Sequence, residues 1–409
     1  MSALRTPEEG AGKAMPYYRT VGELPRKRHT QFRKPDGGLY AEELMGVEGF
    51  SSDSALLYHR FLPTAIVNAE QVEDTRGGTV ANLPLKPRHF RTQELKWAEP
   101  DRVDAVTGRR LLFGNADVSI CFVAANEPSP LYRNAFGDEL LYVQTGGGTL
   151  ETIYGVLKVG VGDYVVIPTS CTYRIVPEGD QELRLLVLEA TGHIGPPKRY
   201  LSAKGQFLEH SPYCERDLRM PTEPLLVDGE DVPVLVRHRA GLTRFTYANH
   251  PFDVVGWDGC LYPWAFNIAD FEPITGRVHQ PPPVHQTFEG PNFVVCSFCP
   301  RKVDYHPLAV PVPYNHANVD SDELMFYVGG NYEARKGSGI GLGSLSLHPS
   351  GCAHGPQPGA AEASLGAERF DETAVMVDTF RPLNLGEAAQ ASEDPRYAWT
   401  WARRGPDWS

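Results

Sequence analysis

The chain has 409 residues and a formal net charge of −12, with 39 Lys and Arg residues against 51 Asp and Glu residues. This acidic balance argues against a nucleic-acid-binding protein, and the one basic stretch, residues 25–34, is too isolated to reverse it. No apolar run approaches the roughly 20 residues of a membrane-spanning helix, and no signal peptide opens the chain, so we expect a cytoplasmic protein without membrane or nucleic-acid partners.

Gly and Pro residues, 40 and 35 in number, separate short runs of Val, Ile, Leu and Tyr. Short strands with such punctuation favour a β-sandwich or β-barrel. Residues 55–67 (ALLYHRFLPTAIV) are the best helical candidate in a chain with few of them. We predict strands, in chain order, within residues 140–143, 157–168, 183–190, 292–298 and 374–380.

The seven Cys residues are scattered, and Cys296 and Cys299 form the only C-x-x-C pair. This pair falls in an apparent strand, where residues three apart point to opposite faces, so the thiols should not meet as a redox or zinc pair. Reduced cysteines of this kind are typical of a cytosolic protein.

The sequence contains an internal duplication. Residues 132–146 (YRNAFGDELLYVQTG) parallel residues 316–330 (HANVDSDELMFYVGG), and residues 162–173 (GDYVVIPTSCTY) parallel residues 343–354 (GSLSLHPSGCAH). Self-similarity at such a long interval predicts two related barrels rather than a solenoid. We expect a mainly β protein with an N-terminal domain at 1–270, whose copy spans about 106–200, and a C-terminal catalytic domain at 271–409.

The second copy carries residues suited to a metal ion. The motif H-x-N-x4-E-x6-G begins at His316 and contains Glu323, and the motif G-x5-P-x-G-x2-H ends at His354. Two imidazoles and one carboxylate bind a first-row divalent ion on one face and leave its other positions free for substrate and O2. The pattern therefore predicts oxygen chemistry at a non-haem iron.

The first copy lacks this donor set. Its three corresponding residues are Tyr132, Glu139 and Tyr173, so both imidazoles are replaced by phenols. Two phenols and one carboxylate make a poor ferrous site. We interpret the first copy as structural.

The paired motifs resemble those of the cupin superfamily, in which strands of a small β-barrel direct His, Glu and His at one metal. The superfamily usually has a second His where this chain has Asn318, which leaves three ligands here. Asp322 stands beside Glu323 and is an alternative carboxylate ligand. Counting to the motif glycine, Gly330, selects Glu323. The expected fold is therefore a bicupin, with jelly-roll units and an N-terminal extension.

The chain also resembles the homogentisate 1,2-dioxygenase family, its bacterial relatives in particular. The resemblance covers most of the chain and rests on residues 252–259 (FDVVGWDG), 276–289 (GRVHQPPPVHQTFE), 316–323 and 346–356 (SLHPSGCAHGP). It implies an Fe(II)-dependent, extradiol-type ring-cleaving dioxygenase that converts homogentisate and O2 to maleylacetoacetate in tyrosine and phenylalanine degradation.

The resemblance further implies roles for single residues. The two motif histidines and Glu323 would bind the iron, and His348 would line the pocket without being a ligand. His285 would exchange a proton with the substrate hydroxyl, for which an ordinary imidazole pKa near ~6.5 is suited. Tyr332 would contact the substrate carboxylate. We expect His279 and His306 to be packing or hydrogen-bonding residues.

Two departures from the family bear on the substrate. The segment 15–32 (MPYYRTVGELPRKRHTQF) replaces a glycine-rich segment of the better-known members, and one more residue separates His316 from Glu323. Gentisate, a hydroxyanthranilate or a modified hydroquinone therefore stay open as substrates. A metal-dependent isomerase or epimerase and a non-catalytic metal- or sugar-binding bicupin are further alternatives. Family resemblance also suggests a homo-oligomer, a trimer or hexamer, with contacts made by the N-terminal arm.

Overall fold

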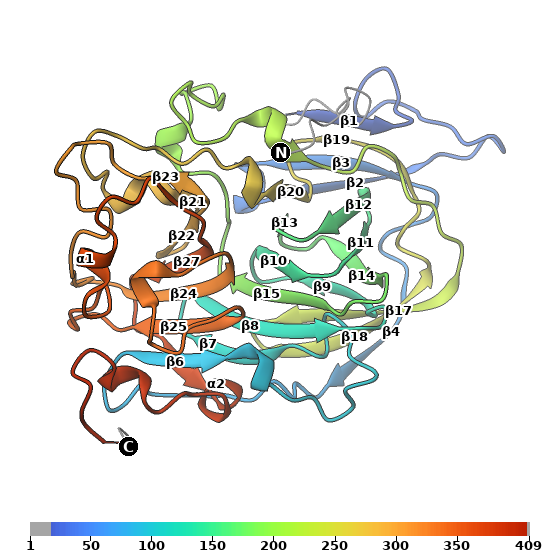
Figure 1. The fold of residues 1–409 in the computed structure, drawn as a ribbon. Coiled ribbons are helices and arrows are strands. Elements are labelled where there is room, and N and C mark those ends of the chain that lie inside the picture. The colour runs from blue at the N-terminus through green and yellow to red at the C-terminus, as the bar shows by residue number, and fades with distance from the viewer. Residues whose placement is uncertain (1–17, 407–409) are drawn as a thin grey trace.

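The computed structural model describes residues 18–406, and most of their regular structure is β (Figure 1). The α-helices are α1 (Ala360–Ala363) and α2 (Glu387–Ala391), and the 3-10 turns are η1 (Glu48–Phe50), η2 (Thr92–Glu94), η3 (Lys198–Tyr200), η4 (Glu215–Asp217), η5 (Ile268–Asp270), η6 (Pro282–His285), η7 (Glu333–Arg335) and η8 (Tyr397–Trp399). No helix within residues 18–406 is long and apolar enough to cross a membrane. The first 17 residues of the N-terminal arm, for which we expect oligomer contacts, lie outside the described residues.

Three large sheets form the body of the molecule. The nine-stranded sheet has the order β16 (Leu218–Arg219), β20 (Trp264–Asn267), β13 (Asp163–Ile167), β10 (Glu139–Thr145), β15 (Leu183–Ala190), β8 (Val118–Ala125), β7 (Arg110–Gly114), β28 (Asn384–Gly386) and β5 (Thr79–Val80). The seven-stranded sheet has the order β12 (Gly155–Gly160), β11 (Gly147–Thr152), β14 (Thr172–Glu178), β9 (Leu131–Asn134), β17 (Glu230–His238), β18 (Gly241–Asn249) and β4 (Ile66–Val72). The six-stranded sheet has the order β21 (Gln286–Gly290), β22 (Phe293–Phe298), β27 (Thr373–Thr379), β24 (Asp322–Gly329), β25 (Ser344–His348) and β6 (Arg88–Arg91).

The nine-stranded sheet packs on both faces. Leu141 and Val143 of β10 belong to the core shared with the seven-stranded sheet, whereas Leu140 and Tyr142 belong to the core shared with the six-stranded sheet. Tyr142 meets Phe326 of β24 edge to face, with ring centroids 6.4 Å apart. Because successive residues of a strand point to opposite faces, burial on both sides explains the continuous apolar sequence of β10.

The strand order reveals the internal duplication. The series β20-β13-β10-β15-β8-β7 in the nine-stranded sheet has the same order as β6-β25-β24-β27-β22-β21 in the six-stranded sheet. The register also agrees, since Glu139 pairs with Glu189 of β15 as Glu323 pairs with Asp378 of β27. The prediction of a mainly β protein with two related cupin-like units is therefore confirmed.

The two units exchange strands. β6, from the N-terminal half, pairs with β25 and extends the six-stranded sheet. In return β28, near the C-terminus, pairs with β7 and β5 of the nine-stranded sheet. The division at residue 270 stays a prediction, and the sheets on either side of it are joined by these exchanged strands.

The helix expected at residues 55–67 is wrong. Those residues form most of β3 (Ser54–His59) and the start of β4, with a turn at Pro63 between them. β3 is an inner strand of a four-stranded sheet, ordered β1 (Arg19–Gly22), β19 (Val254–Gly259), β3 and β2 (Ala41–Gly46). Five consecutive residues of β3 are buried, so its apolar run has no period of two, and such a run cannot be told from a buried helix by periodicity alone. A last pair, β23 (Arg301–Lys302) and β26 (Arg369–Phe370), lies apart from these sheets.

Candidate metal centre

The three motif residues of the second copy converge on the outer face of the six-stranded sheet. Glu323, in β24, alternates with the core residues Leu324 and Phe326 and so points away from the nine-stranded sheet. His316 precedes β24 and His354 follows β25. Two backbone hydrogen bonds of 2.8 Å join these histidines in an isolated antiparallel bridge, which brings their side chains together.

The donor atoms of this group are close enough to share one ion. Glu323 Oε2 lies 3.5 Å from His316 Nε2 and 3.4 Å from His354 Nε2. The ligand atoms of all three residues lie within 4.8 Å of one another. Among residues 18–406, the buried His354 Nε2 has no hydrogen-bond partner, an uncommon state for a buried polar atom and one that a bound cation would relieve. Two imidazoles and one carboxylate therefore fit a divalent first-row ion.

His348 supports the carboxylate and is not free to join the donor set. It lies opposite Glu323 on β25, with its Nδ1 3.0 Å from Glu323 Oε1 and its Nε2 2.9 Å from the Tyr397 hydroxyl. Burial lowers the pKa of His348 to about 3, and the positive charge of Arg335 acts in the same direction. A neutral imidazole with both nitrogens occupied orients Glu323, as outer partners of metal ligands do.

The charge of Glu323 is held in place by its surroundings. Burial alone would raise the pKa of Glu323, but the three imidazoles beside its carboxylate lower it well below its usual range. Asp378, opposite Glu323 on β27, behaves differently, because burial and the negative charge of Glu323 raise its pKa to about 8. Asn318 Nδ2 donates to Asp378 Oδ1 over 3.5 Å. Asp378 has no motif of its own and was not expected from the sequence.

Asp322, the alternative ligand, has a structural task that is repeated in the first copy. Its two carboxylate oxygens accept the backbone N–H groups of Ser350 and Leu383, each over 2.8 Å. In the first copy Asp138, the residue aligned with Asp322, accepts the N–H groups of Thr169 and Ile194 in the same way. Asp322 therefore ties loops together on the far side of the strand from the donor set.

A cavity of about 240 Å³ lies over the donor set. Its lining is mostly apolar and includes Phe298, Val312, Met325, Phe370 and Met376. The polar lining residues, apart from the ligands, include His285, Asn318, Arg301, Tyr327 and Arg335. A mainly apolar pocket with a few converging polar groups is the usual form of a small-molecule site.

His285 lines the cavity at the end of η6 and stacks on Phe298, with ring centroids 4.5 Å apart. Its Nδ1 is buried without a hydrogen-bond partner. Burial, together with the nearby positive charge of Arg301, lowers the pKa of His285 to about 3. The expectation of an ordinary imidazole pKa is therefore wrong, since the ring is neutral throughout the physiological range.

Tyr332 does not line this cavity, unlike its neighbours in the sequence. Its hydroxyl is buried without a partner, and its ring packs on the edge of Tyr327. The cavity wall is formed instead by Tyr327 and Arg335. Arg335 is buried, donates from Nη1 to Gly355 O over 2.6 Å and from Nε to the Tyr327 hydroxyl over 3.2 Å, and has no carboxylate within ion-pair distance in residues 18–406. Sequence reasoning missed Arg335, although it lies only three residues after Tyr332.

The two other histidines of this region make hydrogen bonds, and His279 also lines the cavity over the donor set. His279 Nε2 lies 2.7 Å from the Tyr314 hydroxyl, and His306 Nδ1 accepts the N–H of Leu308 over 3.0 Å. Both are thus hydrogen-bonding residues, as expected.

In the first copy a guanidinium group occupies the centre. Arg109, directly before β7, donates from Nη1 to Glu139 and Glu189 over 2.5 and 2.7 Å, and from Nη2 to the Tyr173 hydroxyl over 2.9 Å. The side chains of Arg109, Glu139 and Glu189 are each 1% exposed. Tyr132 packs its ring against Arg109 and makes no hydrogen bond through its hydroxyl. A site filled by a guanidinium group has no place for a metal ion.

Models of one known protein family match both halves of the chain. A family model of the homogentisate 1,2-dioxygenase N-terminal region matches residues 8–268, and one of the C-terminal region matches residues 278–404. A Saccharolobus solfataricus protein, provisionally described as a dioxygenase, is 38% identical over 390 residues, which cover 95% of this chain and 99% of that protein. The homogentisate 1,2-dioxygenase of Emericella nidulans is 28% identical over 90% of this chain and 84% of its own length. Among solved structures, a cupin 2 conserved barrel domain protein from Leptotrichia buccalis aligns with a TM-score of 0.34 at 13% identity, over 74% of this chain and 99% of that one.

Two cupin-like units in one chain, of which the second has a donor set that fits a metal ion, define the fold as that of a bicupin. The two family matches together span nearly the whole chain and identify one family within this class of proteins. The chain belongs to the homogentisate 1,2-dioxygenase family, and the resemblance expected from its sequence is confirmed.

Proposed function

We propose that the chain is a non-haem Fe(II)-dependent dioxygenase that cleaves the ring of homogentisate with O2 to give maleylacetoacetate, within cytoplasmic tyrosine and phenylalanine degradation. The observation that carries the proposal is the convergence of His316, Glu323 and His354 beneath a small, mainly apolar cavity. Ferrous iron bound by these residues supplies the electron transfer that lets O2 react with an aromatic ring, a reaction that is otherwise spin-restricted.

The residues of the chain bind and orient the aromatic acid. The apolar lining excludes water and accepts the ring, while the neutral imidazole of His285 accepts a hydrogen bond from the substrate hydroxyl. Its Nδ1 is buried and has no hydrogen-bond partner among residues 18–406. Glu323, oriented by His348, keeps its second oxygen on the donor set.

Arg335 supports an acid as the substrate. A buried guanidinium without a carboxylate partner is costly, because its charge is desolvated without compensation. The carboxylate of an aromatic acid bound in the cavity would supply that compensation through a charge-assisted hydrogen bond. We therefore assign the carboxylate to Arg335 and give Tyr332 an indirect role, through its packing on Tyr327.

Oxygen uptake by the Fe(II)-loaded protein tests the proposal against homogentisate, gentisate and unsubstituted hydroquinone. We expect fastest turnover with homogentisate, at least about tenfold above hydroquinone in kcat/KM, because hydroquinone leaves the buried guanidinium unpaired. Absence of oxygen uptake with all three would reject the dioxygenase assignment for hydroquinone acids. Conversion of the substrate without oxygen uptake would instead indicate a metal-dependent isomerase.

A second candidate is the same ring cleavage with a different hydroquinone acid. It is favoured by the position of Tyr332, which the family resemblance assigned to the homogentisate carboxylate and which does not line the cavity. Faster turnover of gentisate than of homogentisate would select it. We also propose a homo-oligomer, a trimer or hexamer, which light scattering on the purified full chain would test.

A further inference from the structure

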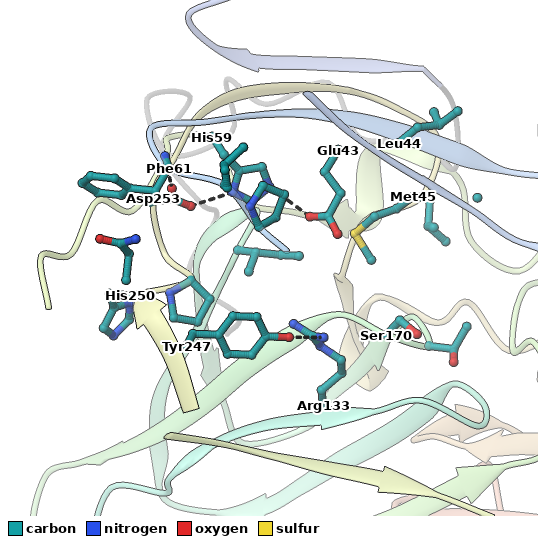
Figure 2. A pocket seen from close by; sticks show the side chains of 18 of the residues that line it. Glu43, Leu44, Met45, His59, Phe61, Arg133, Ser170, Tyr247, His250 and Asp253 are labelled. Carbon is teal, nitrogen blue, oxygen red and sulfur yellow. Dashed lines mark hydrogen bonds and ion pairs between the residues drawn. The ribbon is translucent and has the colours of Figure 1, made fainter. Parts of the chain in front are cut away.

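A second cavity, of about 360 Å³, lies between the four-stranded sheet and the seven-stranded sheet (Figure 2). Its walls come from β2, the end of β3, β9, β18 and the loop after β18. None of its lining residues belongs to the metal centre, and the proposed reaction uses none of them. Its volume is within the range of about 300–1,000 Å³ that is usual for small-molecule pockets.

One wall carries a negative charge. His59 lies between two carboxylates, with its Nδ1 2.6 Å from Asp253 Oδ1 and its Nε2 2.9 Å from Glu43 Oε2. Burial would lower the pKa of His59, but the two carboxylates outweigh burial and raise it to about 9. The cluster thus holds one imidazolium between two carboxylates and keeps one net negative charge. Its exposed member is Glu43, whose side chain is 37% exposed, against 4% for His59 and Asp253.

The opposite wall carries a positive charge. Arg133 of β9 donates from Nε to Thr172 Oγ1 over 2.8 Å and from Nη1 to the Tyr247 hydroxyl over 2.9 Å. These neutral acceptors hold the guanidinium in place, and no carboxylate of residues 18–406 forms an ion pair with it. Figure 2 shows Glu43 and Arg133 pointing into the same space from opposite walls. The two opposite charges therefore face each other across the cavity without pairing.

The rest of the lining includes apolar side chains as well as the polar Ser170, Asn249 and His250. Leu44, Met45, Phe61, Leu62 and Ile153 contribute, and Leu62 stands at the rim with 67% of its surface exposed. An occupant that suits the whole cavity has an ammonium group, a carboxylate and an apolar body. An anion alone or a cation alone leaves one of the two fixed charges without a partner, so neither uses the full site.

We propose that this cavity is a second ligand site, which binds a free α-amino acid with an apolar side chain. The ammonium group lies at Glu43, the carboxylate lies at Arg133, and the side chain packs against Phe61 and Leu62. The site is separate from the metal centre, so its existence does not depend on which aromatic acid the metal centre cleaves.

Calorimetric titration of the full-length protein with L-phenylalanine tests the site. The matched probes are 3-phenylpropionate, which lacks the ammonium group, and 2-phenylethylamine, which lacks the carboxylate. We expect L-phenylalanine to bind at least about tenfold more tightly than either probe, because each lost charge-assisted hydrogen bond weakens binding. Equal affinity for all three compounds, or no binding of L-phenylalanine, L-leucine and L-methionine, overturns the proposal.

Two variants keep the test specific to the cavity. Glu43→Gln should weaken L-phenylalanine binding at least about tenfold. Glu42→Gln is its control, because Glu42 is the next residue on β2, points to the other face and bonds with His29. Leu62→Trp, at the exposed rim, should block the cavity without disturbing the core. Equal weakening by the two Gln variants, or unchanged affinity in Leu62→Trp, contradicts an occupant between these walls.

Discussion

Glu139 of the first copy and Glu323 of the second occupy the same place on equivalent strands, yet their buried charges are balanced differently. Arg109 reaches Glu139 through a direct ion pair and also bonds with Glu189. Around Glu323 three imidazoles converge, one of which, His354, has a buried nitrogen without a partner. A buried carboxylate needs a compensating cation, and a fixed guanidinium excludes metal chemistry whereas a set of imidazoles permits it.

The structure that covers each carboxylate also differs between the two copies. In the first copy the seven-stranded sheet covers the carboxylate, and Tyr132 and Tyr173 of its strands fill the space with phenol rings. In the second copy loops and short turns cover the sheet, and a cavity of about 240 Å³ is left over the donor set. The duplicated fold thus provides a rigid core in one unit and a ligand-accessible site in the other.

The largest effect should follow from removing a ligand of the second copy. We expect purified protein to bind one Fe(II) per chain, and His354→Ala to lose both the iron and the oxygen uptake while the fold survives. Tyr173→Phe, the change at the matching place in the first copy, should keep one iron per chain. Metal analysis and oxygen uptake measure both. Two equivalents of tightly held iron, or full activity in His354→Ala, would contradict this division between the copies.

Arg109 and His285 occupy equivalent places in the two units, because Arg109 directly precedes β7 and His285 directly precedes β21. A substitution at His285 tests whether this place serves the reaction in the second unit. His285→Gln should retain near-normal iron and lose about a hundredfold in turnover, because the reacting hydroxyl loses one hydrogen bond. Metal analysis measures the iron content, and single-turnover rates measure the chemical step. If the variant loses its iron, His285 is a ligand and its catalytic assignment is wrong.

Arg109→Met should be the most destabilising change in the first copy. It leaves Glu139 buried without a cation, and breaking a buried pair in this way costs about 3–5 kcal/mol in the free energy of unfolding. Chemical denaturation measures the loss. Arg184→Met is the control, because Arg184 pairs with Glu182 in a half-exposed position where an ion pair contributes roughly 0–1 kcal/mol. Similar losses in the two variants would show that Arg109 does not hold the first copy together.

The repeated motifs allowed the sequence to predict the duplication and the place of the donor set, because each motif residue keeps its spacing to a turn glycine. Gly330 and Gly146 illustrate this, since both have positive φ, and a Cβ at Gly330 would lie 1.4 Å from Asp371 O. A turn that needs positive φ favours glycine at one position, so this kind of local geometry can be recognised in the sequence.

Contacts between residues far apart in the sequence could not be predicted from local patterns. Arg109 and Glu189 are 80 residues apart and meet only because their strands lie in one sheet. The exchange of β6 and β28 is equally invisible before the sheets are assembled. The low pKa of His285 also depends on burial, which the sequence of a Pro-rich loop does not reveal.

Each unit contains a buried arginine, Arg109 in the first and Arg335 in the second, whose roles can be compared by substitution. Arg109 has two carboxylate partners, whereas Arg335 has none among residues 18–406, so their removal should act on different properties. Arg335→Met should lower kcat/KM for homogentisate about ten- to a hundredfold, the loss of one hydrogen bond to a charged group, and affect hydroquinone less. Steady-state oxygen uptake with both compounds measures the difference. Equal losses for both would show that Arg335 only shapes the cavity.

The smallest effects should come from the two phenols that replace imidazoles in the first copy. The Tyr173 hydroxyl donates to Glu139 over 2.6 Å and accepts from Arg109, whereas the Tyr132 hydroxyl is buried without a partner. Tyr173→Phe should therefore cost about 1.5–3 kcal/mol, because a buried charged group loses a hydrogen bond, while Tyr132→Phe should be neutral or slightly stabilising. Chemical denaturation of the two variants checks the contrast. Equal costs would mean that the phenols stabilise the first copy through ring packing alone, and that the Arg109 cluster does not need the Tyr173 hydroxyl.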